Sequence, residues 1–177
     1  MSSRILGIDI KNHFVNGVVV RTGFKTERIE THFQVPLAGQ GEFEEKLSDA
    51  IKKIVDRIDV KDIFCQVALP ADWIIYRNIN IPIKGQSKIR QVLPYELEPL
   101  LAQPADLFAF DFLPVVINET ENGNHMVAAG VEKVRLKACL GVLAAAKIDP
   151  DVVTAGSCAL ASCLPKVADI PEQAVLV

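Results

Sequence analysis

Few residues in this sequence have the type and spacing that chemistry requires, and the first group lies close to the amino terminus. Asp9 stands near the end of the apolar run Arg4-Ile-Leu-Gly-Ile-Asp-Ile10, and Lys11 and Asn12 follow it. A carboxylate at the end of a strand can organise a hydrated metal ion, and backbone N–H groups in a tight turn beside it can bind phosphate. These three residues therefore suggest a phosphate-binding site.

The other polar candidates give weaker signals. Glu96 and Glu98 lie two positions apart on a predicted helix, so their carboxylates point to different faces and do not form an acid/base pair. The three histidines have no serine or cysteine near them in a nucleophile motif, and we interpret them as structural or surface residues. Trp73 and Arg77 share one face of a predicted strand, which is more typical of core packing than of a ligand site. No catalytic residue and no metal ligand is predicted.

The composition indicates a soluble globular protein. The chain has 177 residues, of which 50% are hydrophobic and 23% charged, enough for a sizeable core. The net charge of −3 is spread along the chain without a basic stripe, which argues against nucleic acid as a partner. The four cysteines lack metal-ligand spacing and are interpreted as reduced, small apolar side chains. No apolar run reaches the roughly 18 residues of a membrane span, and we expect folding in the cytoplasm or in a comparable reducing space.

The first part of the chain predicts a mixed sheet with one helix. Two apolar runs joined at Lys11-Asn12, and an alternating run from Thr26 to Val35, form a three-stranded antiparallel meander. Apolar residues at three- and four-residue steps from Glu42 to Ile58 predict an amphipathic helix. A buried strand from Ile63 to Leu69 follows, and we expect it to run parallel to the first strand.

The middle of the chain predicts a smaller group of elements. A strand from Trp73 to Ile81 precedes a helix from Ser87 to Leu101. Pro94 lies inside that helix, where we expect a kink or a restart. Two further strands, at residues 107–117 and 125–130, flank an Asn-Gly pair that is a strong hairpin signal.

The last part of the chain predicts a buried helix and two short elements. A helix is predicted from Val131 to Ile148, and its stretch from Ala138 to Ala146 is apolar nearly all round, so we expect that stretch to be deeply buried. A short strand at Asp151–Thr154 and a short helix from Ser157, its N-cap, to Leu164 follow. Ala174 to Val177 predicts the start of another strand, which indicates that the sequence is part of a longer protein.

A strand that ends in Asp-x-Gly and turns tightly into a second strand resembles the first phosphate loop of actin-like ATPases and sugar kinases. In this chain Lys11 stands at the place of the glycine. One hypothesis is that Lys11 itself reaches the phosphates. The other is that Asp9 caps the turn through its side chain while Lys11 is solvated, because any side chain at the glycine place blocks close approach of the backbone. On this second hypothesis the loop is degenerate and inactive.

Three segments resemble the cytoplasmic domain of the type II secretion L protein and, more distantly, the type IV pilus assembly M protein. They are the strand entry Ala-Leu-Pro-Ala-Asp-Trp ending at Trp73, the Arg-x-Ile-x-Ile-Pro strand from Arg77, and the helix Lys-Ile-Arg-Gln-Val-Leu-Pro-Tyr-Glu-Leu-Glu-Pro-Leu-Leu from Lys88. The resemblance covers most of the chain.

That resemblance implies an α/β fold, the first half of an actin-like, ribonuclease H-like ATPase fold with a mixed sheet and flanking helices. Residues 1–70 and 131–170 would form a discontinuous first lobe, interrupted by a small inserted α+β subdomain at 71–130. Residues 171–177 would begin the strand that leads into the second half. Pilus M-type members that bind nucleotide resemble this chain at Asp9 and Ile10, whereas Lys11, Asn12 and Asn16 depart from them.

The resemblance also implies a function. It indicates a non-catalytic scaffold at the cytoplasmic face of the inner membrane, which docks the secretion or pilus ATPase or other inner-membrane platform proteins. Neither ATP nor Mg²⁺ is expected as a cofactor. The sequence does not decide between a monomer and a homodimer. The alternatives are an active actin-like ATP-binding protein of pilus assembly and a cell-division-type filament protein.

Overall fold

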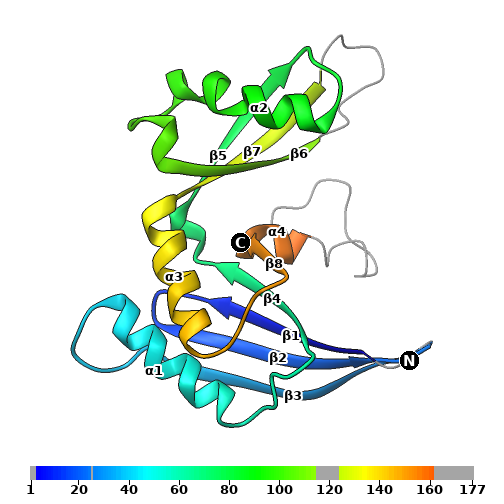
Figure 1. Ribbon diagram of the computed structural model, residues 1–177, viewed down its shortest axis with the longest axis vertical. Helices are drawn as coiled ribbons and strands as arrows, with labels where there is room; N and C mark the ends of the chain where they lie inside the picture. The colour runs from blue at the N-terminus through cyan, green and yellow to red at the C-terminus, as the bar shows by residue number, and fades with distance from the viewer. Residues whose placement is uncertain (1–2, 25, 115–123, 162–177) are drawn as a thin grey trace, which may run out of the picture. The chain divides into compact units, whose positions relative to one another are not determined.

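The computed structural model describes residues 3–24, 26–114 and 124–161. The chain divides into two compact units, which are Met1–Ala71 with Val142–Val177, and Asp72–Gly141. Helix α3 (Lys133–Ala145) crosses the second boundary between them (Figure 1). The lobe boundary expected from the sequence, between residues 130 and 131, lies before this helix.

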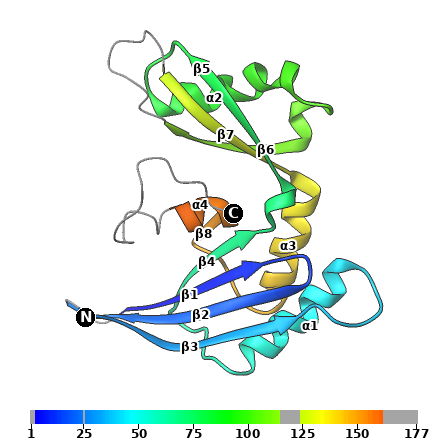
Figure 2. The ribbon, with the colours of Figure 1, turned by 180° about the vertical axis from the view of Figure 1, so that it is seen from behind.

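A five-stranded sheet forms the centre of the first unit, in the order β3-β2-β1-β4-β8 (Figure 2). β1 pairs antiparallel with β2, and β2 with β3, whereas β4 runs parallel to both β1 and β8. The predicted meander and the predicted parallel strand are therefore confirmed. The strands are β1 (Ser3–Ile10), β2 (Phe14–Thr22), β3 (Glu27–Pro36), β4 (Phe64–Leu69) and β8 (Val152–Ala155).

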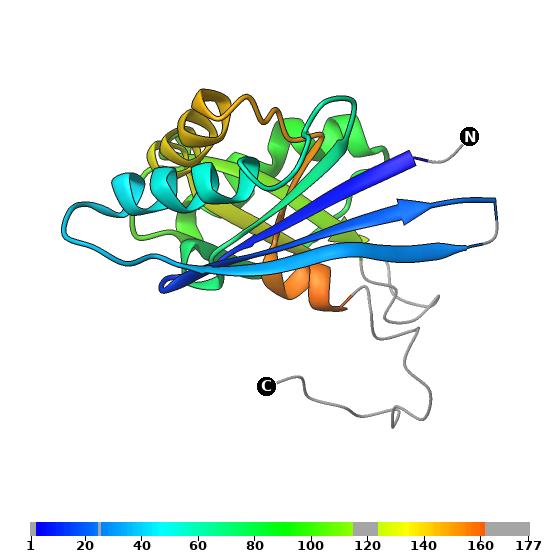
Figure 3. The ribbon, with the colours of Figure 1, turned by 90° about the horizontal axis from the view of Figure 1, so that it is seen from below.

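The two faces of this sheet carry different helices. Helix α1 (Phe43–Val55) lies on one face, and the short helix α4 (Gly156–Ala161) lies on the other (Figure 3). Side chains alternate between the faces of a strand, so Leu6, Ile8 and Ile10 of β1 point toward α1 and are buried, whereas Asp9 points to the other face. The predicted amphipathic helix is confirmed, because α1 buries Leu47, Ala50, Ile51 and Ile54.

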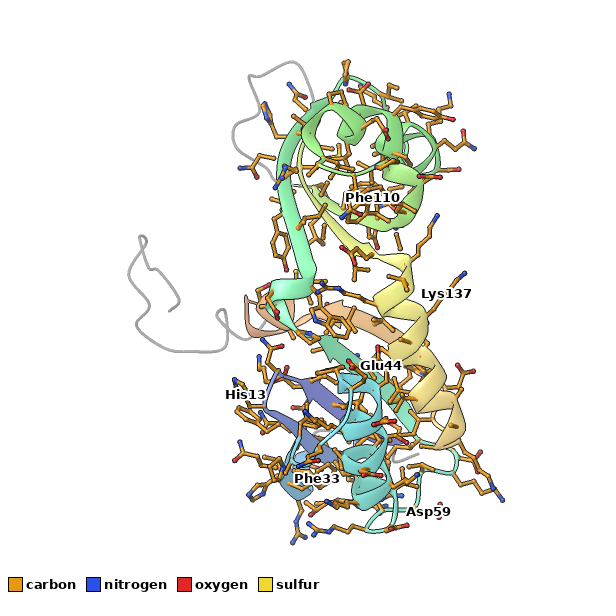
Figure 4. The ribbon with its side chains drawn as sticks, turned by 90° about the vertical axis from the view of Figure 1, so that its left-hand side faces the viewer. His13, Phe33, Glu44, Asp59, Phe110 and Lys137 are labelled. Carbon is orange, nitrogen blue, oxygen red and sulfur yellow. The ribbon has the colours of Figure 1, made fainter. Side chains whose placement is uncertain are left out.

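A phenylalanine ring covers a glycine in the middle of this sheet. Gly17 of β2 pairs with Phe33 of β3, and a Cβ atom at Gly17 would lie only 1.8 Å from Phe33 Cε2. The second unit repeats the arrangement with Gly130 and Phe110, where the distance would be 2.6 Å to Phe110 Cε1 (Figure 4 labels both phenylalanines). In each case the glycine has no side chain, so the phenylalanine ring of the neighbouring strand can pack over its Cα atom.

The second unit is a three-stranded antiparallel sheet covered by one helix. Its strand order is β5-β7-β6, and α2 (Gln86–Leu97) packs against one face. The strands are β5 (Ile74–Ile81), β6 (Phe108–Pro114) and β7 (Asn124–Glu132), with 3-10 turns at Ala71–Trp73, Glu98–Leu100 and Ala105–Leu107. The buried residues of its core are Ile81, Ile89, Leu93, Leu97, Phe112, Met126 and Ala128. The Asn-Gly pair predicted to form the hairpin turn lies outside the described residues.

Pro94 does not restart its helix. α2 continues through Pro94 to Leu97, and the carbonyl of Pro94 accepts the N–H of Glu98. The helix changes to a 3-10 turn only at Glu98. The missing N–H of Pro94 falls in the last turns of α2, so it removes one hydrogen bond without separating two helices.

The prediction that α3 is deeply buried is wrong. Cys139 and Leu143 are buried, four residues apart on one side, whereas Gly141 and Ala144 are exposed and Val134 is 70% exposed. Other elements cover only the side of α3 that carries Cys139 and Leu143, so apolar side chains on its other sides stay exposed.

Two predictions for the end of the chain differ in outcome. α4 begins at Gly156, directly after β8, so Ser157 is the second helical residue and not the N-cap. The predicted strand start at Ala174–Val177 lies outside the described residues.

Burial makes two thiols poor nucleophiles. It raises the pKa of Cys139 from 9.0 to about 11, and burial together with the nearby carboxylate of Asp151 raises that of Cys65 to about 11. The thiolate is the reactive form. In a Cys163→Ser variant at pH 8.5, we therefore expect a thiol reagent to modify half-buried Cys158 first, and Cys65 and Cys139 only when the protein unfolds.

The same pKa shifts give a pH dependence with a defined sign. The unfolded thiols ionise near pH 9.0, whereas the folded thiols stay protonated to about 11. Stability from this source is complete below pH 9 and is lost as pH rises toward 11, because the unfolded state then binds fewer protons. Rapid modification of all described thiols in native protein at pH 8.5 would contradict the prediction that burial protects Cys65 and Cys139.

Candidate functional site

The turn that holds the predicted phosphate-binding residues is fixed by backbone hydrogen bonds. The N–H of Lys11 donates to the carbonyl of Phe14 at 2.9 Å, which closes the β1–β2 hairpin. The N–H of Leu37 donates to the carbonyl of His13 at 2.8 Å and ties the turn to the chain beyond β3. The turn is therefore a constrained element, in which His13 lies at the outer rim of the unit (Figure 4).

The topology brings Asp9 to the edge of the sheet where α/β proteins bind ligands. β1, β4 and β8 run parallel, and Asp9, Ala68 and Thr154 form one row across their carboxyl ends. Ligands of open α/β sheets bind outside these strand ends. A cavity of about 230 Å³ lies on this face, lined by residues that include Gly7, Asp9, Asn16, Gln66, Thr154 and Ala159.

Lys11 turns its ammonium group onto Asp9. The Nζ atom of Lys11 lies 3.3 Å from Oδ1 of Asp9, and the two side chains are 40% and 34% exposed. Oδ1 itself is buried and has no hydrogen-bond donor with good geometry among the described residues, so the contact is electrostatic. Gly156 closes the other side, because a Cβ atom there would lie 3.3 Å from Nζ and 3.5 Å from Oδ1.

Neither alternative from the sequence describes this geometry. The side chain of Lys11 is not simply solvated, and in the described part of the chain no backbone N–H of the turn donates a hydrogen bond to the carboxylate of Asp9. Asn12 is exposed in the turn. The structure thus brings two of the three predicted residues together and leaves the third apart.

These residues do not fit a bound metal and nucleotide. The Cβ and side chain of Lys11 stand where a glycine would let phosphate approach the backbone. The carboxylate that would organise the hydrated metal is already paired with an ammonium group. Among the described residues, no group of three or more His, Cys, Asp or Glu side chains is placed to hold a metal ion.

A second cluster of side chains lies in the smaller unit. The sequence analysis named two of its members, Trp73 and Arg77, but not Arg135. The guanidinium of Arg135 lies 5.7 Å from the ring centre of Trp73 and pairs with Glu132 at 3.1 Å. Arg77 donates from Nε to the carbonyl of Leu100 at 3.2 Å. With Phe108 these side chains line a cavity of about 230 Å³. The i,i+3 spacing of Glu132 and Arg135 was the available signal.

Glu98 has a structural role that the sequence did not reveal. Its Oε2 atom accepts a hydrogen bond at 2.7 Å from the N–H of Ala105, which starts the 3-10 turn before β6. Glu96 is exposed. The two carboxylates therefore act separately, as the helical spacing predicted.

Comparison with known proteins identifies the family of this chain. The family model described as "Type II secretion system (T2SS), protein L" matches residues 25–169. The chain belongs to the protein L family of the type II secretion system. A search of curated proteins finds no match.

Two solved structures resemble the protein L chain. The cytoplasmic domain of EpsL, an inner-membrane component of the type II secretion system of Vibrio cholerae, matches over 86% of the chain with a TM-score of 0.59 and 23% identity. The PilM-PilN type IV pilus biogenesis complex matches over 92% with a TM-score of 0.74 and 20% identity. The chain spans 57% and 49% of these two structures' chains.

The comparisons confirm the predicted resemblance and the predicted fold. The mixed sheet with its smaller antiparallel sheet has the actin-like architecture of cytoplasmic EpsL and PilM. Within the described ranges, the protein L chain has no helix that is both long and apolar enough to cross a membrane.

Proposed function

We propose that this protein L chain is a non-catalytic docking domain at the cytoplasmic face of the inner membrane. The single observation that carries the proposal is the ion pair between Lys11 and Asp9, because it occupies the place where a metal and phosphate would have to bind. A domain of this fold that binds no nucleotide can still bind other proteins through its surface.

The comparisons support this proposal in two ways. The EpsL domain is described as a cytoplasmic part of an inner-membrane secretion component. The PilM fold is seen in a complex with PilN, so the architecture is compatible with docking another assembly protein. For this chain we infer the corresponding partners, which are the secretion ATPase and membrane-anchored platform proteins.

We also propose that the smaller unit, Asp72–Gly141, presents the docking surface. The division predicted from the sequence, 1–70 with 131–170 and 71–130, would assign the start of α3 to the other lobe. Several large apolar side chains of the smaller unit are exposed, and Trp73 with Arg135 lines its cavity. Tryptophan and arginine are enriched in the residues that carry binding energy at interfaces. The exposed apolar side chains are Tyr95, Leu100, Leu107, Leu113 and Val134.

Titration calorimetry with Mg-ATP tests the absence of nucleotide binding. We expect no binding heat from the full-length cytoplasmic region. Lys11→Gly is expected to stay without heat as well, because Asn12 and Asn16 still differ from nucleotide-binding relatives in the predicted loop pattern. Micromolar binding by the native protein, whether or not Lys11→Gly weakens it, would reverse the proposal in favour of an ATP-binding protein.

A partner assay completes the test. The secretion ATPase should be retained by the immobilised native domain, and a Trp73→Ala/Arg135→Ala variant should lose most of that retention while keeping its melting temperature. An unchanged retention would place the docking surface elsewhere.

A second candidate, an active actin-like ATP-binding protein, is favoured only by the presence of Asp9 at the end of β1. A third, a filament protein, predicts polymerisation. Sedimentation of the full-length protein at high concentration separates it from the others, because a single small species excludes filaments.

A further inference from the structure

The carboxylate of Asp9 has an unusual environment. Its Oδ1 atom is shielded from water, yet no donor within the described residues forms a hydrogen bond with it. Removing a charged oxygen from water without replacing its hydrogen bonds is costly. The one compensation that the described residues provide is the ammonium of Lys11 at 3.3 Å.

The walls of this site form no hydrogen bond with Oδ1 among the described residues. The backbone of Gly156 lies against both charged atoms, and the carbonyl oxygen of Leu69 lies on the same side, 3.6 Å from where a Gly156 Cβ would be. A carbonyl oxygen is an acceptor and carries partial negative charge.

We propose that Lys11 is a built-in counter-cation, which takes the position that a metal ion would need and keeps the crevice neutral without a ligand. The inference rests on the proposed function, because it explains how an actin-like crevice stays stable when no nucleotide binds. The site accepts one class of group, a cation beside the carboxylate of Asp9, and the chain supplies that cation itself.

The two partners of this pair are not equivalent. Oδ1 of Asp9 cannot reach water, whereas the flexible Lys11 side chain is 40% exposed and its ammonium can turn into solvent. Losing the lysine therefore leaves the shielded Oδ1 of a one-third exposed carboxylate without its cation, while losing the charge of Asp9 leaves a lysine that becomes hydrated. The proposal thus predicts an asymmetric pair of substitutions.

A double-mutant cycle by thermal unfolding measures this asymmetry. Lys11→Met keeps the aliphatic stem and should lower the melting temperature by about 2 to 4 °C, the shift that a modest destabilisation causes in a chain of this size. Asp9→Asn alone should lower it by less. The double variant should be as stable as Asp9→Asn, because the buried charge is gone.

A metal titration adds a readout that general destabilisation would not change. With Mn²⁺ as the probe, Lys11→Met should gain a few degrees of melting temperature at millimolar metal, because ligands that bind only the folded state stabilise it. The native protein should not respond, since Lys11 is paired with the carboxylate of Asp9. The double variant should not respond either, since it carries no charge at position 9.

The outcomes separate this inference from the proposed function. Equal melting temperatures for native protein and Lys11→Met, or equal effects of Lys11→Met with and without Asp9, would overturn the counter-cation. Absence of a Mn²⁺ response in Lys11→Met would overturn its equivalence to a metal site. Neither result depends on nucleotide, whereas Mg-ATP binding by native protein would overturn the proposed function whatever the cycle gives.

Discussion

Gly17→Ala is expected to lower the melting temperature of this protein by roughly 4 to 10 °C. The added Cβ would lie 1.8 Å from Cε2 of Phe33, which is far inside van der Waals contact. The ring is buried against the sheet, so it cannot turn away without leaving the core. Overpacking of this kind costs about 3 kcal/mol. Thermal unfolding followed by circular dichroism measures the effect.

Gly141→Ala is the matched control, because it is the same chemical change in an exposed part of α3. No atom lies within 4 Å of a Cβ at that position, and alanine favours a helix over glycine by about 1 kcal/mol. It should leave stability unchanged or raise it. Phe33→Leu in the Gly17→Ala background should recover part of the loss, since the smaller side chain makes room. A Gly17→Ala protein as stable as the native one would show that Phe33 does not pack on Gly17.

Leu93→Ala is expected to destabilise the smaller unit by about 2 to 5 kcal/mol. Leu93 is 1% exposed and lies at the centre of the core that α2 forms with the three-stranded sheet. The substitution removes buried apolar groups and leaves a cavity in a unit with few other core residues. Hydrogen exchange should increase first in α2, β5 and β7, because these elements share that core.

Tyr95→Ala is the control on the same helix. Tyr95 is 79% exposed, so its removal should change stability by less than about 0.5 kcal/mol. The pair also informs the docking proposal. If the smaller unit presents the docking surface, Leu93→Ala should weaken retention of the secretion ATPase at temperatures where that unit opens. Equal protection of α2 in both variants would contradict the assignment of Leu93 to the core.

Local pattern was sufficient for most of the elements. The apolar runs of β1 and β2, the alternation of β3 and the three- and four-residue steps of α1 predicted the meander and the helix with its buried face. In β3 only Phe33 and Val35 of the predicted face are buried, whereas Ile29 is exposed. These features depend on neighbours close in sequence, so periodicity reveals them. The motif that ends at Trp73 and the helix with Pro94 predicted the family and the actin-like fold, which the comparisons confirm.

The errors have a common physical cause. α3 has an apolar sequence but is buried only along Cys139 and Leu143, because hydropathy does not record how much of an alanine-rich surface other elements cover. The prediction of Ser157 as an N-cap is wrong because α4 already begins at Gly156, directly after β8. Each error came from judging a segment alone when its packing decided the result.

The sequence by itself determined that Asp9 ends a strand, that Lys11 replaces a glycine, and that the chain folds as an actin-like domain. Only the tertiary structure decided where the ammonium of Lys11 goes and which rings cover Gly17 and Gly130. Those facts depend on contacts between segments far apart in the chain, such as Gly156 against Asp9. Local preferences cannot encode such contacts, because the partner atoms meet only after the sheet has assembled.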